Sequence, residues 1–205
     1  MARRSKEEAE QTRQALLSTA LAEFSDKGIG QISLKQLSVE AGMTHGALYW
    51  HFRNRQDLLE TLYHEHLFPF DLHYLEQRQA ARQDALGALQ GLLADVLKDV
   101  ERKDEYRHYY KVFFYHPEQQ PELLPLLPRL TERREEWIAK IAYFLRQARK
   151  QDQIQLKKTK VEMIARSIFS MFSGLLESWL RQPLTASLQQ QGNETFRIFL
   201  SGLRS

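Results

Sequence analysis

Residues 33–59 read SLKQLSVEAGMTHGALYWHFRNRQDLL, and this stretch decides the fold. Ser33 is followed three residues later by Gln36, which is the spacing of a capping box at the start of a helix. Gly42 ends that helix, and Thr44 can cap the next one. Two short helices joined by so tight a turn are typical of a helix-turn-helix unit, whose second helix enters the major groove of DNA.

Helical periodicity extends to both sides of this stretch, and no segment alternates convincingly with a period of two. Upstream, a helix is predicted from about Lys6 to about Lys27, with an inward face formed by Leu16, Ala20, Leu21 and Phe24. Downstream, the apolar spacing predicts helices that start near Arg55 and that cover 86–100, 106–115, 130–148, 161–180 and 194–203. We therefore expect an all-α fold.

Prolines interrupt this pattern at two places. Pro69 lies in the helix that starts near Arg55. Because proline cannot donate the helical hydrogen bond, we expect a kink or a break near Phe68 and a new start at Leu72. Four prolines between 117 and 128 exclude one regular helix there and predict a loop with about one helical turn.

Composition excludes several classes of protein. The 205 residues suffice for one or two domains, and the absence of cysteine excludes disulfide frameworks, thiolate metal sites and cysteine nucleophiles. The longest apolar stretch, 167–176, is about half of what a membrane-spanning helix needs. No apolar segment follows the basic residues near the N-terminus, as a secretory signal would require. We expect a cytoplasmic protein that does not enter a membrane.

The sequence also lacks the usual marks of an enzyme. It contains no glycine-rich phosphate loop, no paired carboxylates in an apolar setting and no spacing that assembles a Ser/His/Asp group. His64, Glu65 and His66 do not share a helix face, so we expect no metal site. We therefore expect neither catalysis nor a bound cofactor.

Charge is distributed unevenly around the helix-turn-helix segment. The whole chain has a formal net charge of +3, yet residues 1–60 carry eight basic and eight acidic groups. Between Glu40 and Asp57 there is no carboxylate, whereas hydroxyl, imidazole and guanidinium donors are frequent. A surface with these donors suits phosphate oxygens and base edges, so the placement of charge rather than its total indicates DNA binding.

The segment Ala41–Leu59 resembles the recognition segment of the TetR family of bacterial repressors. The N-terminal third is especially similar to AcrR-type repressors of multidrug efflux pumps. This resemblance implies a helix-turn-helix DNA-binding domain over residues 1–54 and a helical ligand-binding and dimerisation domain over 55–205.

The resemblance also implies which side chains meet DNA. It assigns base contacts to the start of the second short helix, at Thr44, His45, Gly46 and Ala47. It assigns phosphate contacts to Tyr49, Trp50, His51 and Arg55, with Ser33 and Lys35 flanking the groove. Aromatic side chains at helical spacing often belong to a core. The lack of carboxylates nearby favours contact with DNA for Tyr49 and leaves both interpretations open for Trp50.

Aromatic residues are frequent beyond residue 60, as in a pocket for a hydrophobic ligand. The residues expected to line this pocket are Tyr63, His66, Leu67, Phe70, Phe113, Trp137, Ile141 and Phe172. Each of them could instead fill the core. In the helix over 161–180, Met163, Phe169 and Leu176 form a second apolar side, which indicates either a subunit interface or a fully enclosed helix.

These expectations combine into one functional hypothesis. The chain would be a ligand-responsive repressor that binds palindromic operator DNA as a homodimer and controls a multidrug efflux pump gene. A small hydrophobic effector, neutral or cationic, would enter beside Tyr63 and shift the helix that starts near Arg55. An activator, or a regulator of a metabolic operon with an unrelated effector, is the alternative.

Overall fold

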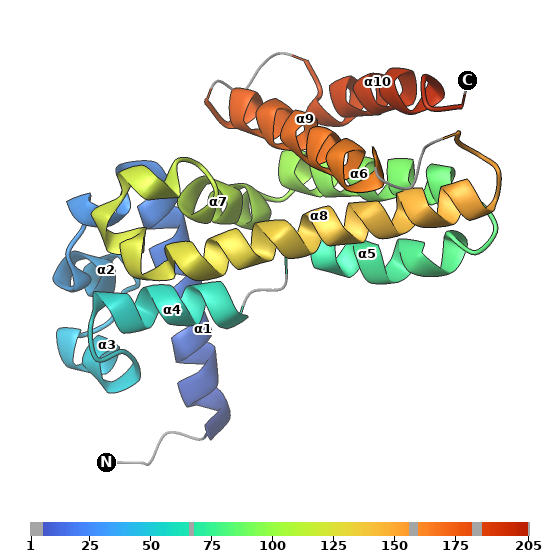
Figure 1. Cartoon of the computed structure of the whole chain (residues 1–205). Helices are drawn as coiled ribbons and strands as arrows, with labels where there is room; N and C mark the ends of the chain where they lie inside the picture. Colours follow the sequence, from blue (N-terminus) through green and yellow to red (C-terminus); the bar gives the residue numbers. More distant parts are fainter. Residues whose placement is uncertain (1–5, 66–67, 156–159, 182–185, 205) are drawn as a thin grey trace. The chain divides into compact units, whose positions relative to one another are not determined.

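The computed structural model describes residues 6–65, 68–155, 160–181 and 186–204, and these residues contain helices and turns but no strand (Figure 1). The all-α prediction is therefore confirmed. The α-helices are α1 (Lys6–Lys27), α2 (Leu34–Glu40), α3 (His45–His51), α4 (Arg55–Glu65), α5 (Pro69–Ala80), α6 (Ala85–Arg102), α7 (Asp104–Phe113), α8 (Leu127–Lys150), α9 (Val161–Arg181) and α10 (Leu188–Ser201). Three short 3₁₀ segments are η1 (Ile29–Gln31), η2 (Pro117–Gln119) and η3 (Pro121–Leu126). Within the described ranges, no helix has the length and apolar character needed to cross a bilayer.

The chain forms two compact units. The first unit comprises Met1–His66 and Arg107–Pro128, and the second comprises Leu67–Tyr106 and Arg129–Ser205. Each unit thus contains segments that are far apart in the sequence. The division into functional domains at residues 54 and 55 stays a prediction.

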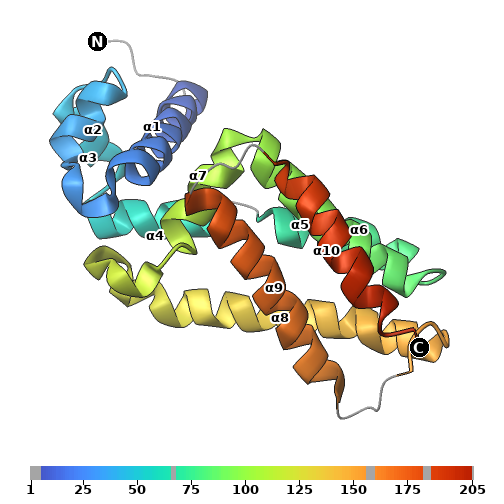
Figure 2. The same ribbon diagram turned by 90° about the horizontal axis from the view of Figure 1, so that it is seen from above.

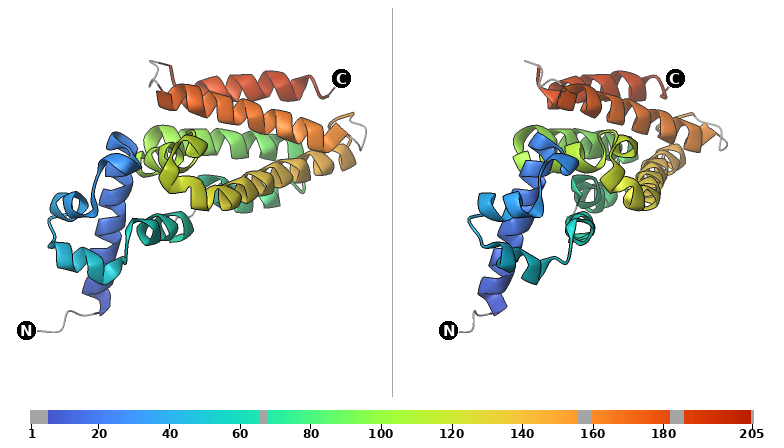
Figure 3. Two further views of the ribbon diagram at one scale, coloured as in Figure 1. Left: turned by 60° about the vertical axis from the view of Figure 1, so that its left-hand side comes forward. Right: turned by 90° about the vertical axis from the view of Figure 1, so that its left-hand side faces the viewer.

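In the first unit, α2 and α3 lie together, and α2 packs on α1 (Figure 3). The predicted inward face of α1 is confirmed, since its four members are buried. Tyr109 of α7 donates its hydroxyl hydrogen bond to the backbone carbonyls of Leu62 and Tyr63, at 3.3 and 3.0 Å. This contact ties α7 to α4 within the unit.

The helix ends of the first unit are formed as the sequence predicts. Ser33 and Gln36 make a complete capping box at the start of α2. Gly28 and Gly42 have φ angles of 90° and 66°, in the left-handed region that glycine adopts without steric cost. The α1–α2 and α2–α3 turns therefore depend on these two glycines.

In the second unit, α6 runs beside α5 and α10 (Figure 2). The predicted start of the last helix near Glu194 is wrong, because Ser187 caps α10 and accepts a hydrogen bond from the Gln190 N–H at 3.2 Å. Gly192 lies inside this helix and is buried. A Cβ at Gly192 would overlap Cδ1 of Leu97 on α6, so the glycine permits close packing of the two helices.

The expected interruption occurs at both places, but the details differ from the expectation. The helix breaks rather than kinks, since α4 ends at Glu65, and α5 begins at Pro69 itself and not at Leu72. Proline is favoured in the first turn of a helix because its missing N–H has no partner there in any case. The segment 117–128 is also more helical than predicted, with η2, η3 and the first residues of α8 in place of one turn.

Candidate DNA-binding surface and ligand-binding core

The surface of α3 is built on two buried anchors. Leu48 and Phe52 are each 1% exposed and fix the helix to its unit. The Thr44 hydroxyl accepts a hydrogen bond from the Ala47 N–H at 3.2 Å, which caps the first turn. His45 and Gly46 are exposed, Ala47 is half-buried, and a Cβ added at Gly46 would meet nothing within 4 Å. The first turn of α3 therefore presents little bulk and several polar groups.

The aromatic residues of α3 point away from the core. Tyr49 is 47% exposed and Trp50 is 73% exposed, so the interpretation of these two side chains as core residues is wrong. The rings of His45 and Tyr49 meet edge to face at 4.7 Å, and those of Trp50 and His51 do so at 4.6 Å. Exposed indole and phenol groups can donate hydrogen bonds to phosphate oxygens, and edge-to-face contacts limit the orientations they adopt.

Two of the predicted DNA-contacting residues have partners within the first unit. The hydroxyl and backbone N–H of Ser33 are both hydrogen-bonded to the Gln36 side-chain oxygen, at 2.8 Å each. Arg55 donates from Nη2 to the carbonyl of Ile32 at 2.7 Å, and its Nη1 lies 3.7 Å from Glu122 Oε1. Ser33 therefore closes the first turn of α2, and Arg55 holds the residue that precedes this cap. Lys35 is exposed.

Residues 41–56 contain no Asp or Glu, and we call this segment the acid-free window. The two carboxylates that border it are paired with cations. Glu40 lies 3.7 Å from Lys27 Nζ. Asp57 accepts hydrogen bonds from the side chain and the backbone N–H of Arg53, and these hold the pKa of the Asp57 carboxyl below its ordinary value. Because both pairs are exposed, their stabilising effect is small. Their cationic partners reduce the negative potential at the two edges of the α3 surface.

The residues predicted to line a ligand pocket are distributed over both units. In the first unit, Tyr63 and Phe113 are buried, with ring centroids 5.8 Å apart. In the second unit, Phe70 stacks on Trp137 at 5.1 Å and meets Phe172 edge to face at 5.9 Å.

The remaining members of the predicted pocket are Ile141, His66 and Leu67. Ile141 is fully buried in the second unit. His66 and Leu67 lie outside the described residues. The structure therefore brings together Phe70, Trp137 and Phe172, whose aromatic cluster we call the second-unit core.

One polar residue that is hydrogen-bonded to the second-unit core escaped the sequence analysis. Asp71 accepts hydrogen bonds from Arg133 Nη1 at 3.0 Å, from Trp137 Nε1 at 3.2 Å and from Lys140 Nζ. The local signal for it is an acidic residue two positions after Pro69, between Phe70 and Leu72. Its donors lie 62 to 69 residues away along the chain, so spacing could not reveal them. In the described part of the chain, no three His, Asp or Glu side chains are grouped so as to hold a metal ion.

Comparison with known proteins gives matches to both the sequence and the fold. Residues 16–62 match the sequence profile of the family described as "Bacterial regulatory proteins, tetR family". The HTH-type transcriptional regulator AcrR of Shigella flexneri is 27% identical over 206 aligned positions, which cover 98% of this chain and 93% of AcrR.

Two solved structures resemble the whole fold. NalD, the secondary repressor of the MexAB-OprM multidrug efflux pump in Pseudomonas aeruginosa, superposes with a TM-score of 0.72 at 24% identity, covering 97% of this chain and 98% of NalD. The complex of SmeT with triclosan superposes with a TM-score of 0.71 at 18% identity, covering 94% of this chain and 91% of SmeT. At these identities the two structures establish similarity of fold alone.

Proposed function

We propose that the chain, whose residues 16–62 match the sequence profile of the TetR family, is a ligand-responsive repressor that binds palindromic operator DNA as a homodimer in the cytoplasm. The observation that carries this proposal is the α3 surface, which is exposed, free of carboxylates and fixed by Leu48 and Phe52. Such a helix can lie in the major groove without electrostatic repulsion from the phosphates.

The proposed contacts with DNA follow from exposure and hydrogen-bonding capacity. Thr44, His45, Gly46 and Ala47 meet base edges at the start of α3, where Gly46 leaves room for close approach. The phosphate contacts come from Tyr49, Trp50, His51 and Arg55, and Arg55 retains Nε–H and further N–H groups beyond those given to Ile32 and Glu122. Lys35 and Ser33 border the groove from α2.

The proposed dimer interface involves α9 and α10. Met163 on α9 and Ile198 on α10 are each 57% exposed, so both helices offer an apolar side chain to a second copy. The exposed positions of α9 that follow Met163 on the same face carry the small residues Ser167, Ser170, Gly174 and Ser178. Phe169 and Leu176, by contrast, are buried within the chain itself, so for them the enclosed arrangement is the correct one. Small exposed residues allow a second copy of the helix to approach closely.

We place the effector site in the second-unit core. Phe70, Trp137 and Phe172 are at most 1% exposed, so a ligand reaches them when these aromatic side chains repack. The similarity to AcrR and to NalD favours an efflux pump gene as the target, and the SmeT complex with triclosan favours a hydrophobic effector. A shift of α4, which follows α3 directly in the chain, would then change the separation of the two α3 helices in the dimer.

The test of this proposal is DNA binding by the full chain. A gel shift would use the DNA upstream of its own gene and of the adjacent operon. The salt concentration is kept low because contacts with phosphates are strongest under that condition. Trp50→Ala should weaken binding about tenfold, since an indole hydrogen bond to a charged phosphate is lost. Leu75→Ala on α5 is the matched control, because Leu75 is 65% exposed and lies outside the α3 surface.

Effectors are tested in the same assay with triclosan and with tetraphenylphosphonium, a hydrophobic cation. Release of DNA by either compound supports the proposal. Equal binding by wild type, Trp50→Ala and Leu75→Ala contradicts the assignment of α3 as the recognition helix. Transcription that rises on adding the protein to its own promoter would identify an activator instead.

A further inference from the structure

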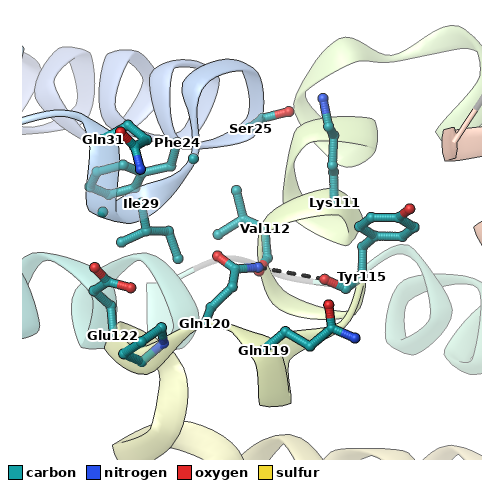
Figure 4. Close-up of a pocket in the computed structure, with 13 residues that line it drawn as sticks. Phe24, Ser25, Ile29, Gln31, Lys111, Val112, Tyr115, Gln119, Gln120 and Glu122 are labelled. Atoms are coloured by element: carbon teal, nitrogen blue, oxygen red, sulfur yellow. Dashed lines mark hydrogen bonds between the residues drawn. The ribbon is translucent and has the colours of Figure 1, made fainter.

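The first unit contains a pocket whose lining residues differ from those assigned to the two sites above. Its walls come from the end of α1 (Phe24 and Ser25), from residues 28–31, from α7 and the turn after it, and from residues 119–122 (Figure 4). The volume of the pocket is about 580 Å³, which is within the usual range for sites that bind small molecules.

One part of the pocket is apolar. Phe24, Ile29 and Val112 line it, and each of these side chains is almost fully buried. Pro121 adds further apolar surface. The side chains of this part can pack on the hydrocarbon portion of a ligand, but they cannot form hydrogen bonds with it.

The other part carries two donors that have no partner among the described residues. Ser25 is 5% exposed, and its buried hydroxyl makes no hydrogen bond to any described residue. Lys111 lines the same pocket, and its ammonium group makes neither a hydrogen bond nor an ion pair within the described ranges. Figure 4 shows the Ser25 hydroxyl turned towards the side where Lys111 stands. A buried hydroxyl without a partner is costly, and a ligand that accepts its hydrogen bond removes that cost.

The acidic residue of the pocket is separately neutralised. Glu122 lies at the opposite side from Lys111 in Figure 4, and its Oε1 is 3.7 Å from Arg55 Nη1. The unpaired charge that faces a ligand is therefore the positive charge of Lys111.

We propose that this pocket binds a small organic carboxylate. The carboxylate accepts hydrogen bonds from Lys111 and Ser25, and the apolar part of the ligand packs on Phe24, Ile29 and Val112. An inorganic anion would leave the apolar part empty, and a cation would face Lys111. The ligand would contact residues 28–31, which connect α1 to the Ser33 cap of α2.

The test is calorimetric titration of the full chain with benzoate, in the absence of DNA. Lys111→Gln should weaken benzoate binding at least about tenfold, because a charge-assisted hydrogen bond is lost. Ser25→Ala should weaken it about threefold to fivefold without lowering the thermal unfolding midpoint, since the hydroxyl has no partner in the free protein. Lys98→Gln on α6 is the matched control and should leave benzoate binding unchanged.

Two further ligands test the chemical class. Benzamide, which is neutral and of the same shape, and inorganic phosphate, which lacks an apolar part, should each bind at least about tenfold more weakly than benzoate. The proposal is overturned if benzoate does not bind at about 10 mM, if Lys111→Gln binds it as wild type does, or if either comparison ligand binds equally well. An effector acting at the second-unit core would bind Lys111→Gln and wild type alike, so the two sites are distinguishable.

Discussion

Replacing Arg55 by glutamine should destabilise the first unit. Arg55 was predicted from the sequence to reach a phosphate, yet its guanidinium also donates to the Ile32 carbonyl at 2.7 Å and faces Glu122 at 3.7 Å. Ile32 immediately precedes Ser33, the N-cap of α2. The side chain thus connects α4 to the segment from which the helix-turn-helix begins.

The size of the effect can be worked out from these two contacts. A hydrogen bond from a charged donor to a partly buried carbonyl contributes about 1.5–3 kcal/mol. The ion pair with Glu122 adds less than about 1 kcal/mol, since the two side chains are 31% and 25% exposed. Arg55→Gln should therefore cost about 2 kcal/mol of unfolding free energy. In a chain of this length that corresponds to a fall in the thermal midpoint of about 4–8 °C.

The assay is urea and thermal unfolding followed by far-ultraviolet circular dichroism. Arg53→Gln is the matched control, because the Arg53 side chain is 86% exposed and pairs only with Asp57 among the described residues. This control should change the unfolding free energy by no more than about 0.5 kcal/mol.

Equal stability of the Arg55→Gln and Arg53→Gln proteins would refute this reasoning, because it would mean that the contacts to Ile32 and Glu122 contribute nothing. The proposed phosphate contact is tested separately by the salt dependence of operator binding. Loss of one contact should reduce the slope of log K against log salt concentration by about 0.9. An unchanged slope would restrict Arg55 to its structural role.

Three further outcomes follow from single positions. Gly46→Ala should raise stability by up to about 1 kcal/mol, because a methyl group there meets open space in a helix, yet it should weaken operator binding in the gel shift by occupying the proposed DNA surface. Gly192→Ala should lower stability by about 1–2 kcal/mol in urea unfolding, because the new methyl overlaps buried Leu97; unchanged stability would mean that α6 and α10 can separate without cost. Burial lowers the pKa of His108 from its ordinary value of 6.5, so the unfolded chain takes up the proton first and stability should fall as the pH drops below about 6.5. His108→Gln should flatten the pH dependence of the urea midpoint between about pH 7 and pH 5, and an identical curve in the two proteins would contradict the assignment to His108.

Much of the first unit is determined by the sequence alone, because its signals act over three or four residues. The Ser33 capping box, the Thr44 cap and the positive φ angle of Gly42 depend on neighbours in the chain, and all of them occur in the structure. Periodicity likewise located α1 and its inward face. The acid-free window is evident from the residue types alone. Whether Trp50 lies in the core or on the surface was left open by the sequence, and the structure shows it exposed.

Only the tertiary structure decided the features that depend on distant parts of the chain. From the sequence alone, Gly192 is expected to interrupt a helix. In the structure it lies inside α10, where its lack of a side chain allows Leu97 of α6 to pack against it. Asp71 acquires its donors from α8, more than sixty residues away. The pocket lined by Ser25 and Lys111 has no sequence signal, because neither residue is unusual until the fold leaves both without a partner in the described part of the chain. Hydrogen bonds between near neighbours in the chain can be predicted from the sequence, whereas the partners of a buried polar group depend on which helices pack together.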